Sequence, residues 1–178
     1  MIICGYAGIG KSTLSKNYPM VIDLESTPFE KDWDRYAKCA IYYSNQGYLV
    51  LISCHKEIRE RICNYDNGVK FGNRITIVPS VEDKELYRER YKNRGNTQEF
   101  IDMQMNNWEK WLDEKENKII NEHWEVMKPG ETLYDTIIRL SKLPPYKFCS
   151  CEQYCLADEC GSEETKCYNP LKPYVLKF

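Results

Sequence analysis

The stretch MIICGYAGIGKST (residues 1–13) opens the chain and matches the pattern G-x-x-x-x-G-K-[ST] from Gly5 to Ser12. The apolar residues 1–4 predict a strand before the pattern, and residues 11–17 predict a helix after it. A strand, a glycine-rich turn and a helix in this order form a phosphate-binding loop, and a chance glycine-rich turn would lack this context. The stretch therefore predicts that the chain binds a nucleoside triphosphate.

Each position of the loop has its own expected task. The glycines allow the backbone to wrap closely, so that its N–H groups point at phosphate oxygens. Lys11 is expected to bind the β and γ phosphates as a point charge, and Ser12 to offer its hydroxyl to Mg²⁺. The residues predicted to bind ATP are Gly5, Gly8, Ile9, Gly10, Lys11, Ser12 and Thr13.

Beyond the loop, short apolar runs alternate with longer helical stretches, which is typical of an α/β fold with a mostly parallel sheet. Strands are expected at residues 1–4, 20–23, 48–53, 74–78 and 124–127, and helices at 11–17, 30–46, 56–64, 81–93, 97–121 and 132–143. Residues 97–121 are expected to form one long helix, because apolar residues recur at helical spacing from Ile101 to Leu112. Thr132 is the expected N-cap of the last helix.

The composition limits the function classes. A chain of 178 residues with 42% apolar residues has the size of one domain. Its net charge of −2 gives no global basic field, so nucleic acid is not the expected partner, although a local basic patch stays open. No run of about 18 apolar residues predicts a membrane span, and no leader precedes the first strand. We expect a cytoplasmic protein whose partner is a small-molecule nucleotide; the sequence does not determine the oligomeric state.

Asp23 stands at the carboxyl end of the second expected strand and Glu25 follows it, where ligands of open α/β sheets bind. Asp23 could orient an acceptor, take a proton from an acceptor hydroxyl, or hold Mg²⁺ through water. Glu25 is a second candidate, and a solvated turn is the alternative for both. The strand at 48–53 ends without the aspartate that motor ATPases and GTPases need for magnesium, which argues against those classes. His55 could line the pocket, cap a helix or lie on the surface.

The charged stretch at residues 81–93 contains a pair of arginines at helical spacing. Arg90 and Arg94 lie four residues apart and share a helix face, and Gly95 follows them. Mobile arginines stabilise the charge that spreads over a transferring phosphoryl group. A catalytic pair in a closing lid and an ordinary solvated helix with Glu–Arg pairs both fit this pattern.

Three segments resemble the P-loop kinases of small molecules and nucleoside monophosphates, a group that includes gluconate, shikimate and adenylate kinases. They are residues 5–13, residues 21–26 with Asp23, and Arg90-x-x-x-Arg94. The chain looks most like the compact nucleotide kinases that bacteriophages encode, which for a phage protein would mean the host cytoplasm.

The resemblance implies a kinase domain at residues 1–143 with a three-layer αβα fold, a five-stranded parallel sheet of order 2-3-1-4-5 and a helical lid at about 82–121. It implies that Asp23 lies in the acceptor site and that the base of ATP lies near residues 128–130. The nearest candidates for an arginine that binds an acceptor phosphate are Arg59 and Arg61, with Arg35 from the other side.

Three functional hypotheses follow. The first is a kinase that transfers the γ-phosphate of ATP to a nucleoside monophosphate or related nucleotide, with Lys11, Asp23, Arg90 and Arg94 as catalytic residues. The second is a kinase for a hydroxyl acceptor, such as a sugar acid or a polynucleotide end, in which Asp23 is the general base. The third is an interaction module that binds a nucleotide without turnover.

The tail at residues 144–178 is expected to be irregular and is rich in cysteine. Five of the nine cysteines lie there: Cys149, Cys151, Cys155, Cys160 and Cys167. Four thiolates would suit a structural zinc ion, but the spacings differ from two C-x₂-C pairs and no histidine lies nearby. Free thiols in a loosely packed tail are the alternative.

Overall fold

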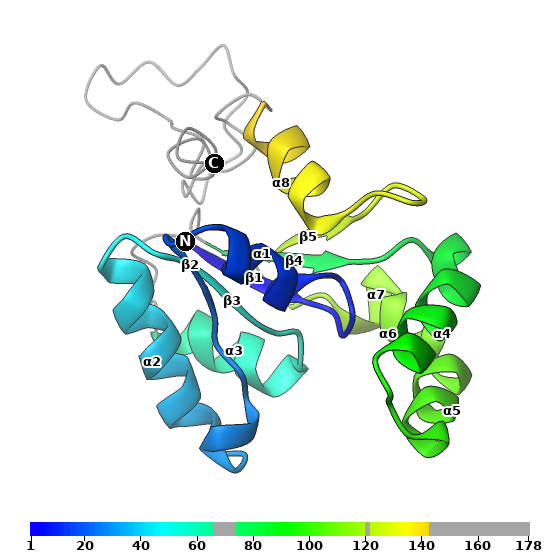
Figure 1. Ribbon diagram of the computed structural model, residues 1–178. Coiled ribbons are helices and arrows are strands. Elements are labelled where there is room, and N and C mark those ends of the chain that lie inside the picture. The colour runs from blue at the N-terminus through cyan, green and yellow to red at the C-terminus, as the bar shows by residue number, and fades with distance from the viewer. Residues whose placement is uncertain (66–73, 120–121, 143–178) are drawn as a thin grey trace.

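Five parallel strands form one sheet in the computed structural model of the chain, in the order β2-β3-β1-β4-β5 (Figure 1). The structure describes residues 1–65, 74–119 and 122–142. The strands are β1 (Ile2–Gly5), β2 (Val21–Asp23), β3 (Leu49–Ser53), β4 (Arg74–Val78) and β5 (His123–Val126). This architecture confirms the expected α/β fold and strand order. The predicted cysteine-rich tail at 144–178 lies outside the described residues.

The centre of the sheet is buried on both faces. Every residue of β1 and β4 is buried, and β3 is buried up to Ser53. In the parallel register, Ile3 pairs with Leu51 on one side and with Ile75 on the other. Strands of this kind need continuous apolar runs, because helices cover both of their faces.

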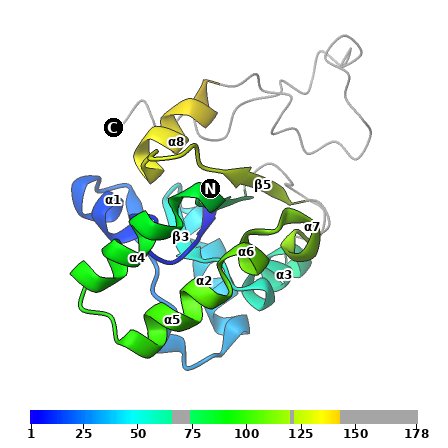
Figure 2. The same ribbon diagram turned by 90° about the vertical axis from the view of Figure 1, so that its right-hand side faces the viewer.

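Four helices form the outer layers: α1 (Lys11–Asn17), α2 (Trp33–Asn45), α3 (Lys56–Tyr65) and α8 (Leu133–Ser141), with a 3-10 turn η1 (Thr27–Phe29) before α2. Helices α2 and α3 bury Ala37 and Ile58 in one hydrophobic cluster, whereas α1 and α8 bury Leu14 and Ile137 in the other. The sheet therefore lies between two layers of helix, with α8 on the opposite side from α2 and α3 (Figures 1 and 2). Among the described helices, none has the length and apolar character needed to cross a bilayer.

A cluster of short helices connects β4 to β5 and lies at the right of Figure 1. It consists of η3 (Val81–Asp83), α4 (Lys84–Asn93), α5 (Gln98–Asn106), α6 (Trp108–Leu112) and α7 (Glu114–Asn117). The prediction of one helix over 97–121 was therefore wrong. The apolar stripe from Ile101 to Leu112 is buried as expected, but the helix ends at Asn107 and again at Asp113.

Local hydrogen bonds explain both breaks. The Asn107 side chain donates to the carbonyl of Met103 at 2.8 Å, and the Asp113 carboxylate accepts from the backbone N–H of Lys115 at 2.9 Å. Asn and Asp offer the backbone such alternatives to a continuous helix. The breaks allow buried Trp108 to donate from its indole nitrogen to the carbonyl of Val81 at 3.0 Å.

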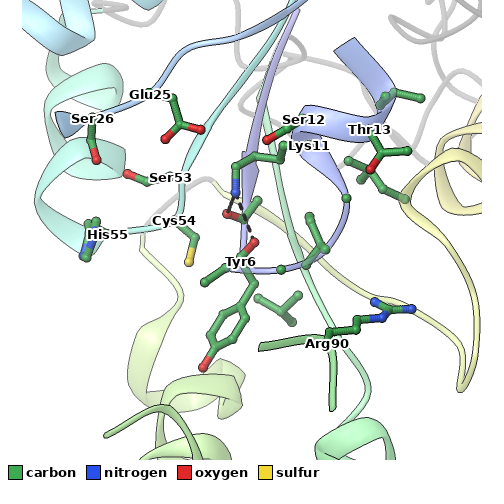
Figure 3. A pocket seen from close by; sticks show the side chains of 18 of the residues that line it. Tyr6, Lys11, Ser12, Thr13, Glu25, Ser26, Ser53, Cys54, His55 and Arg90 are labelled. Carbon is green, nitrogen blue, oxygen red and sulfur yellow. Dashed lines mark hydrogen bonds between the residues drawn. The ribbon is translucent and has the colours of Figure 1, made fainter. Parts of the chain in front are cut away.

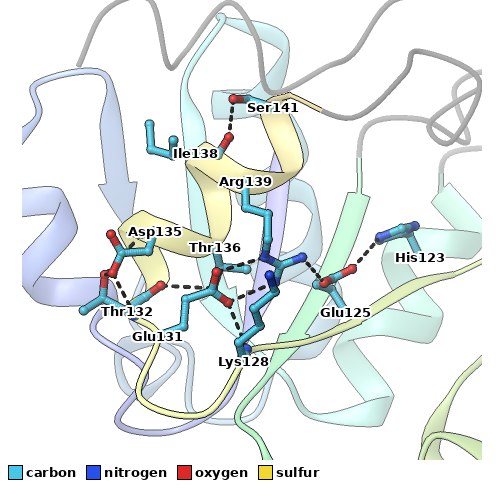
Figure 4. Close-up of polar contacts among 10 residues, drawn as sticks. All are labelled: His123, Glu125, Lys128, Glu131, Thr132, Asp135, Thr136, Ile138, Arg139 and Ser141. Atoms are coloured by element: carbon cyan, nitrogen blue, oxygen red, sulfur yellow. Dashed lines mark hydrogen bonds and ion pairs between the residues drawn. The ribbon is translucent and has the colours of Figure 1, made fainter.

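The start of α8 is fixed twice. Thr132 is the N-cap, as predicted: its hydroxyl accepts from the Asp135 N–H at 3.2 Å, and Asp135 accepts from the Thr132 N–H at 3.1 Å. Arg139 on α8 binds Glu131 at 2.9 Å and Glu125 on β5 at 2.7 Å (Figure 4). These bonds fasten the loop before α8 to the sheet.

Candidate functional site

The predicted phosphate loop connects the end of β1 to the start of α1. Gly8 and Gly10 have φ angles of 79° and 106°, in the left-handed region that favours glycine. A Cβ atom on Gly8 would lie 2.8 Å from the ring of Tyr91, whose hydroxyl donates to the carbonyl of Ala7 at 3.0 Å. The loop is therefore packed directly against α4, and glycine is required where the two meet.

Lys11 closes the loop from inside. Its Nζ donates to the carbonyls of Gly5 and Tyr6 at 3.0 and 3.1 Å (Figure 3). Burial lowers the pKa of Lys11, while the nearby Cys54, Asp23 and Glu25 act in the opposite direction. An ammonium group has three N–H donors, so one remains for a ligand. A polyanion bound here would stabilise the charge that burial destabilises.

Ser12 and Asp23 form a pair beside the loop. The Ser12 hydroxyl donates to Asp23 Oδ2 at 2.6 Å, and Asp23 Oδ1 is buried without a hydrogen bond from any described residue. A hydroxyl and a carboxylate with a spare oxygen fit Mg²⁺, which usually takes few protein ligands and completes its shell with phosphates and water. In the described part of the chain, no three His, Cys, Asp or Glu residues come together as a metal site. A cation bound here would therefore need phosphate oxygens and water to complete its shell.

A cavity of about 1400 Å³ opens in front of the loop. Of the two carboxylates at the end of β2 and just beyond it, Glu25 lines the cavity, whereas Asp23 is not among the lining residues. The end of β3 also contributes Ser53, Cys54 and His55 (Figure 3). The sequence did not rank the two carboxylates in this way. Asp23 faces Ser12, and Glu25 faces the space where a second ligand would lie.

Tyr36 on α2 holds this edge of the cavity together. Its hydroxyl donates to the carbonyl of Leu24 at 2.6 Å and accepts from the Ser53 N–H at 3.1 Å. These two bonds connect the segments at the ends of β2 and β3, and so fix the backbone positions from which Glu25 and Cys54 project. Tyr36 had no role in the sequence-based hypotheses, because nothing in the pattern separates it from the other apolar residues of its helix.

Arg90 and Arg94 both line the cavity, from the end of α4. The Arg90 guanidinium lies 4.7 Å from the ring centroid of Tyr87, which holds it close to the loop. Arg88 points elsewhere and pairs with Glu85 at 2.9 Å. The shared face predicted for Arg90 and Arg94 is therefore directed at the candidate site.

The three arginines considered for an acceptor phosphate are placed differently. Arg59 is buried and lines the cavity, but each of its three guanidinium nitrogens already donates: to the carbonyl of Cys54, to Glu122 and to the carbonyl of Asn117. Arg61 pairs with Asp34 at 2.9 Å, Arg35 lies 5.8 Å from the ring of Phe29, and neither is among the lining residues. Arg59 is thus a structural residue, and no arginine of this set is free at the cavity within the described chain.

The cavity also extends past the end of α1. Tyr18 and Tyr134 lie there with parallel rings, 5.8 Å between centroids and 6° between planes, and both line the cavity. The base of ATP was expected near residues 128–130, but the lining residues of this loop are Thr132, Leu133 and Tyr134. The part of the cavity nearest to the expected position is therefore the first turn of α8, where Tyr18 and Tyr134 offer two aromatic faces.

The cysteines divide into two groups. Cys4, Cys39, Cys54 and Cys63 are free thiols in the described residues. Burial raises the pKa of the Cys54 thiol although Lys11 opposes the shift, so this thiol is not an activated nucleophile. The candidate zinc ligands Cys149, Cys151, Cys155, Cys160 and Cys167 lie outside the described residues.

Comparisons with protein-family models, with curated proteins and with solved structures found no match to this chain. The proposed function therefore depends on the chemistry of three features: the phosphate loop, the carboxylates Asp23 and Glu25, and the cavity in front of the loop.

Proposed function

We propose that the protein is an ATP-dependent phosphotransferase that moves the γ-phosphoryl group to a nucleoside monophosphate or a related nucleotide. The observation that carries the proposal is a phosphate loop with Lys11 and the Ser12–Asp23 pair at the edge of a cavity of about 1400 Å³. Pockets for one small ligand typically have about 300–1,000 Å³. A larger cavity with an anion site in its wall suits a donor and an acceptor bound together.

In this proposal the loop amides and Lys11 bind the β and γ phosphates, and the base of ATP stacks at Tyr134 beyond the end of α1. Ser12 and Asp23 would hold Mg²⁺, which when bound neutralises charge on the phosphate oxygens. Arg90 and Arg94 approach from α4 and stabilise the charge on the transferring group.

The transfer breaks the bond between the γ phosphorus and the oxygen that bridges to the β phosphate, and ADP leaves with that oxygen. The acceptor oxygen forms the new bond to phosphorus. A monophosphate acceptor is already ionised and needs no base. Glu25 lines the cavity where the acceptor would lie, so it orients the acceptor sugar through hydrogen bonds.

A hydroxyl acceptor is the second candidate, and one observation favours it. Arg59 is bound by Glu122 and by two backbone carbonyls, and Arg61 and Arg35 do not line the cavity, so none of the three arginines considered is free for an acceptor phosphate. Glu25 would then accept the proton of the hydroxyl as the oxygen attacks phosphorus.

A screen with labelled ATP and Mg²⁺ tests the proposal, with nucleoside monophosphates, nucleosides and sugar acids as acceptors. Labelled nucleoside diphosphate is the expected product. Asp23→Asn should raise the Mg²⁺ concentration for half-maximal rate by about 10- to 100-fold, because it weakens a metal partner. Glu25→Gln should leave that concentration unchanged and raise KM for the acceptor.

The pH profile of Glu25→Gln separates the two candidates. A hydroxyl acceptor requires that this variant loses the acidic limb of the rate profile, whereas a monophosphate acceptor predicts a parallel profile. Tight ATP binding without transfer to any acceptor would contradict both, and would leave the nucleotide-dependent interaction module.

A further inference from the structure

One wall of the cavity combines aromatic rings with buried polar atoms that lack partners. Tyr6, Gln104 and Trp124 are 4%, 7% and 8% exposed, and all three line the cavity. Their polar atoms (the Tyr6 hydroxyl, Gln104 Oε1 and Trp124 Nε1) have no hydrogen-bond partner among the described residues. Leaving such a group unpaired costs about 1–3 kcal/mol. Three in one cavity indicate a ligand that supplies the partners.

The three side chains are held in place by their neighbours. Tyr6 packs edge-on against Trp108, with ring centroids 5.6 Å apart, and Arg59 lies 5.3 Å from the ring centroid of Trp124. Gln104 projects from the same face of α5 as buried Ile101. Burial raises the pKa of Tyr6, so its hydroxyl stays protonated and can donate at any ordinary pH. The rings are therefore held in place, and a ligand reaches the three buried polar atoms when the side chains that cover them shift.

The chemistry of this wall selects a flat ring with alternating polar groups on its edge. Trp124 Nε1 can only donate, Gln104 Oε1 can only accept, and the Tyr6 hydroxyl can do both. Phe100 and Trp111 add aromatic surface to the same cavity. Nucleobases stack on such rings and form paired hydrogen bonds with glutamine amides. A sugar acid would instead need a cation beside these rings, and Arg59, which lines the cavity next to Trp124, is already bound to Glu122.

We propose that this wall binds the nucleobase of the acceptor, with Gln104 as the residue that recognises its polar edge. The inference rests on the proposed phosphotransferase function and narrows the acceptor to a free nucleoside or its monophosphate. Both sources share the base, and the experiment below tests them side by side.

Calorimetric titration of the full chain provides the test. The protein is first titrated with AMPPNP and Mg²⁺, and then with the common nucleosides, their 5′-monophosphates, and ribose 5-phosphate as a ligand without a base. At least one base-containing ligand should bind about 10-fold or more tightly than ribose 5-phosphate, because stacking on aromatic rings contributes about 1–3 kcal/mol per base.

Variants at Gln104 assign the effect. Gln104→Leu should reduce that preference by about 10-fold without changing AMPPNP affinity, and Gln104→Glu should change the order of the bases because it replaces an N–H donor with an acceptor. Gln98→Leu is the matched control on α5: Gln98 is exposed and donates to Asp102 at 2.8 Å, away from the cavity. Thermal melting shows whether each variant folds.

Equal binding of ribose 5-phosphate and every base-containing ligand would overturn the inference, as would a folded Gln104→Leu variant that keeps the preference. Transfer to oligonucleotide ends alone would also contradict it. The first titration separates failure of the proposed function from failure of this inference. If the protein does not bind AMPPNP, the proposed function itself is contradicted. If it binds AMPPNP but shows no preference for a base, only the role of this wall is contradicted.

Discussion

The cavity around the phosphate loop and the salt-bridge cluster at α8 differ in whether their polar groups have partners. In the cluster, which comprises Glu125, Glu131 and Arg139, every carboxylate has a partner, and bonds from Arg139 lower the pKa of Glu131 to about 2. In the cavity, burial lowers the pKa of Lys11, and Gln104 Oε1 has no partner within the described chain. The cluster is complete by itself, whereas the cavity retains unpaired groups that the proposed ligands would pair.

This difference separates stability from function. A satisfied network contributes to the free energy of unfolding, and an unsatisfied one reduces it, so natural proteins retain the second kind chiefly at functional sites. The two regions meet at the start of α8, where Thr132 and Tyr134 line the cavity while Glu131 binds Arg139. The cluster therefore holds one edge of the cavity in position without contacting a ligand.

The largest expected effect comes from Lys11→Ala. Removing a cation from the transferring phosphates should lower the rate constant by about 10³-fold, or about 4 kcal/mol of transition-state stabilisation. The free energy of unfolding should change by less than about 1 kcal/mol, because losing two hydrogen bonds offsets losing a buried charge. Rates with labelled ATP and urea unfolding measure the two quantities.

Lys92→Ala is the control for Lys11→Ala, since Lys92 is exposed and pairs with Glu89 at 2.8 Å on the outer side of α4. It should leave both quantities unchanged. A Lys11→Ala variant that transfers phosphate at the wild-type rate would show that the phosphate loop does not bind the transferring group. The functional difference between the cavity and the salt-bridge cluster would then be contradicted.

The opposite pattern is expected for Glu131→Gln. The pKa of Glu131 falls from 4.5 to about 2 on folding, chiefly through Arg139, with the Lys128 N–H and the Thr136 hydroxyl contributing. A carboxylate with a lowered pKa stabilises the folded state fully above about pH 4.5 and loses this effect as the pH falls through 2. Because this pair is partly exposed to solvent, the variant should lose only about 1–2 kcal/mol at pH 7 and little near pH 2.

Urea titrations of Glu131→Gln at several pH values measure this loss, with Glu89→Gln as an exposed control. Transfer rates at a temperature where the variant is folded should stay near the wild-type value. A loss that does not depend on pH would show that Glu131 acts through packing rather than through its charge.

The sequence was sufficient for the fold because the signals that set it are local. The glycine pattern from Gly5 to Ser12 fixes the first βα unit, and continuous apolar runs such as residues 49–52 require a sheet covered on both faces. The long helix over 97–121 was mispredicted because the spacing of apolar residues continues through the breaks and does not indicate where a helix ends. The break at Asn107 depends on a side-chain bond to Met103 and on the position of Trp108, which is set by tertiary contacts.

The candidate site was only partly predictable. Loop residues such as Lys11 and Ser12 follow from the motif, whereas the different environments of Asp23 and Glu25 depend on strand register and on Tyr36. Tyr6 occupies a position where the motif accepts any residue, so no pattern singles it out. Gln104 did leave a signal: it lies on the buried stripe of α5 between Ile101 and Met105, and a polar residue at a core position calls for a partner.

Tyr91→Phe carries the smallest expected effect, and it tests the residue that connects α4 to the phosphate loop. Tyr91 is fully buried, its ring blocks any side chain at Gly8, and its hydroxyl donates to the carbonyl of Ala7. The variant keeps the ring and removes the bond, so it should lose about 1 kcal/mol of unfolding free energy and raise KM for ATP about fivefold.

Tyr87→Phe is the control. It removes the same atom from a neighbouring buried ring that makes no hydrogen bond to the loop in the described structure, so its KM for ATP should stay at the wild-type value. If Tyr91→Phe and Tyr87→Phe changed KM equally, the phosphate loop would be shaped by its own glycines alone, and the packing of α4 against it would serve stability only.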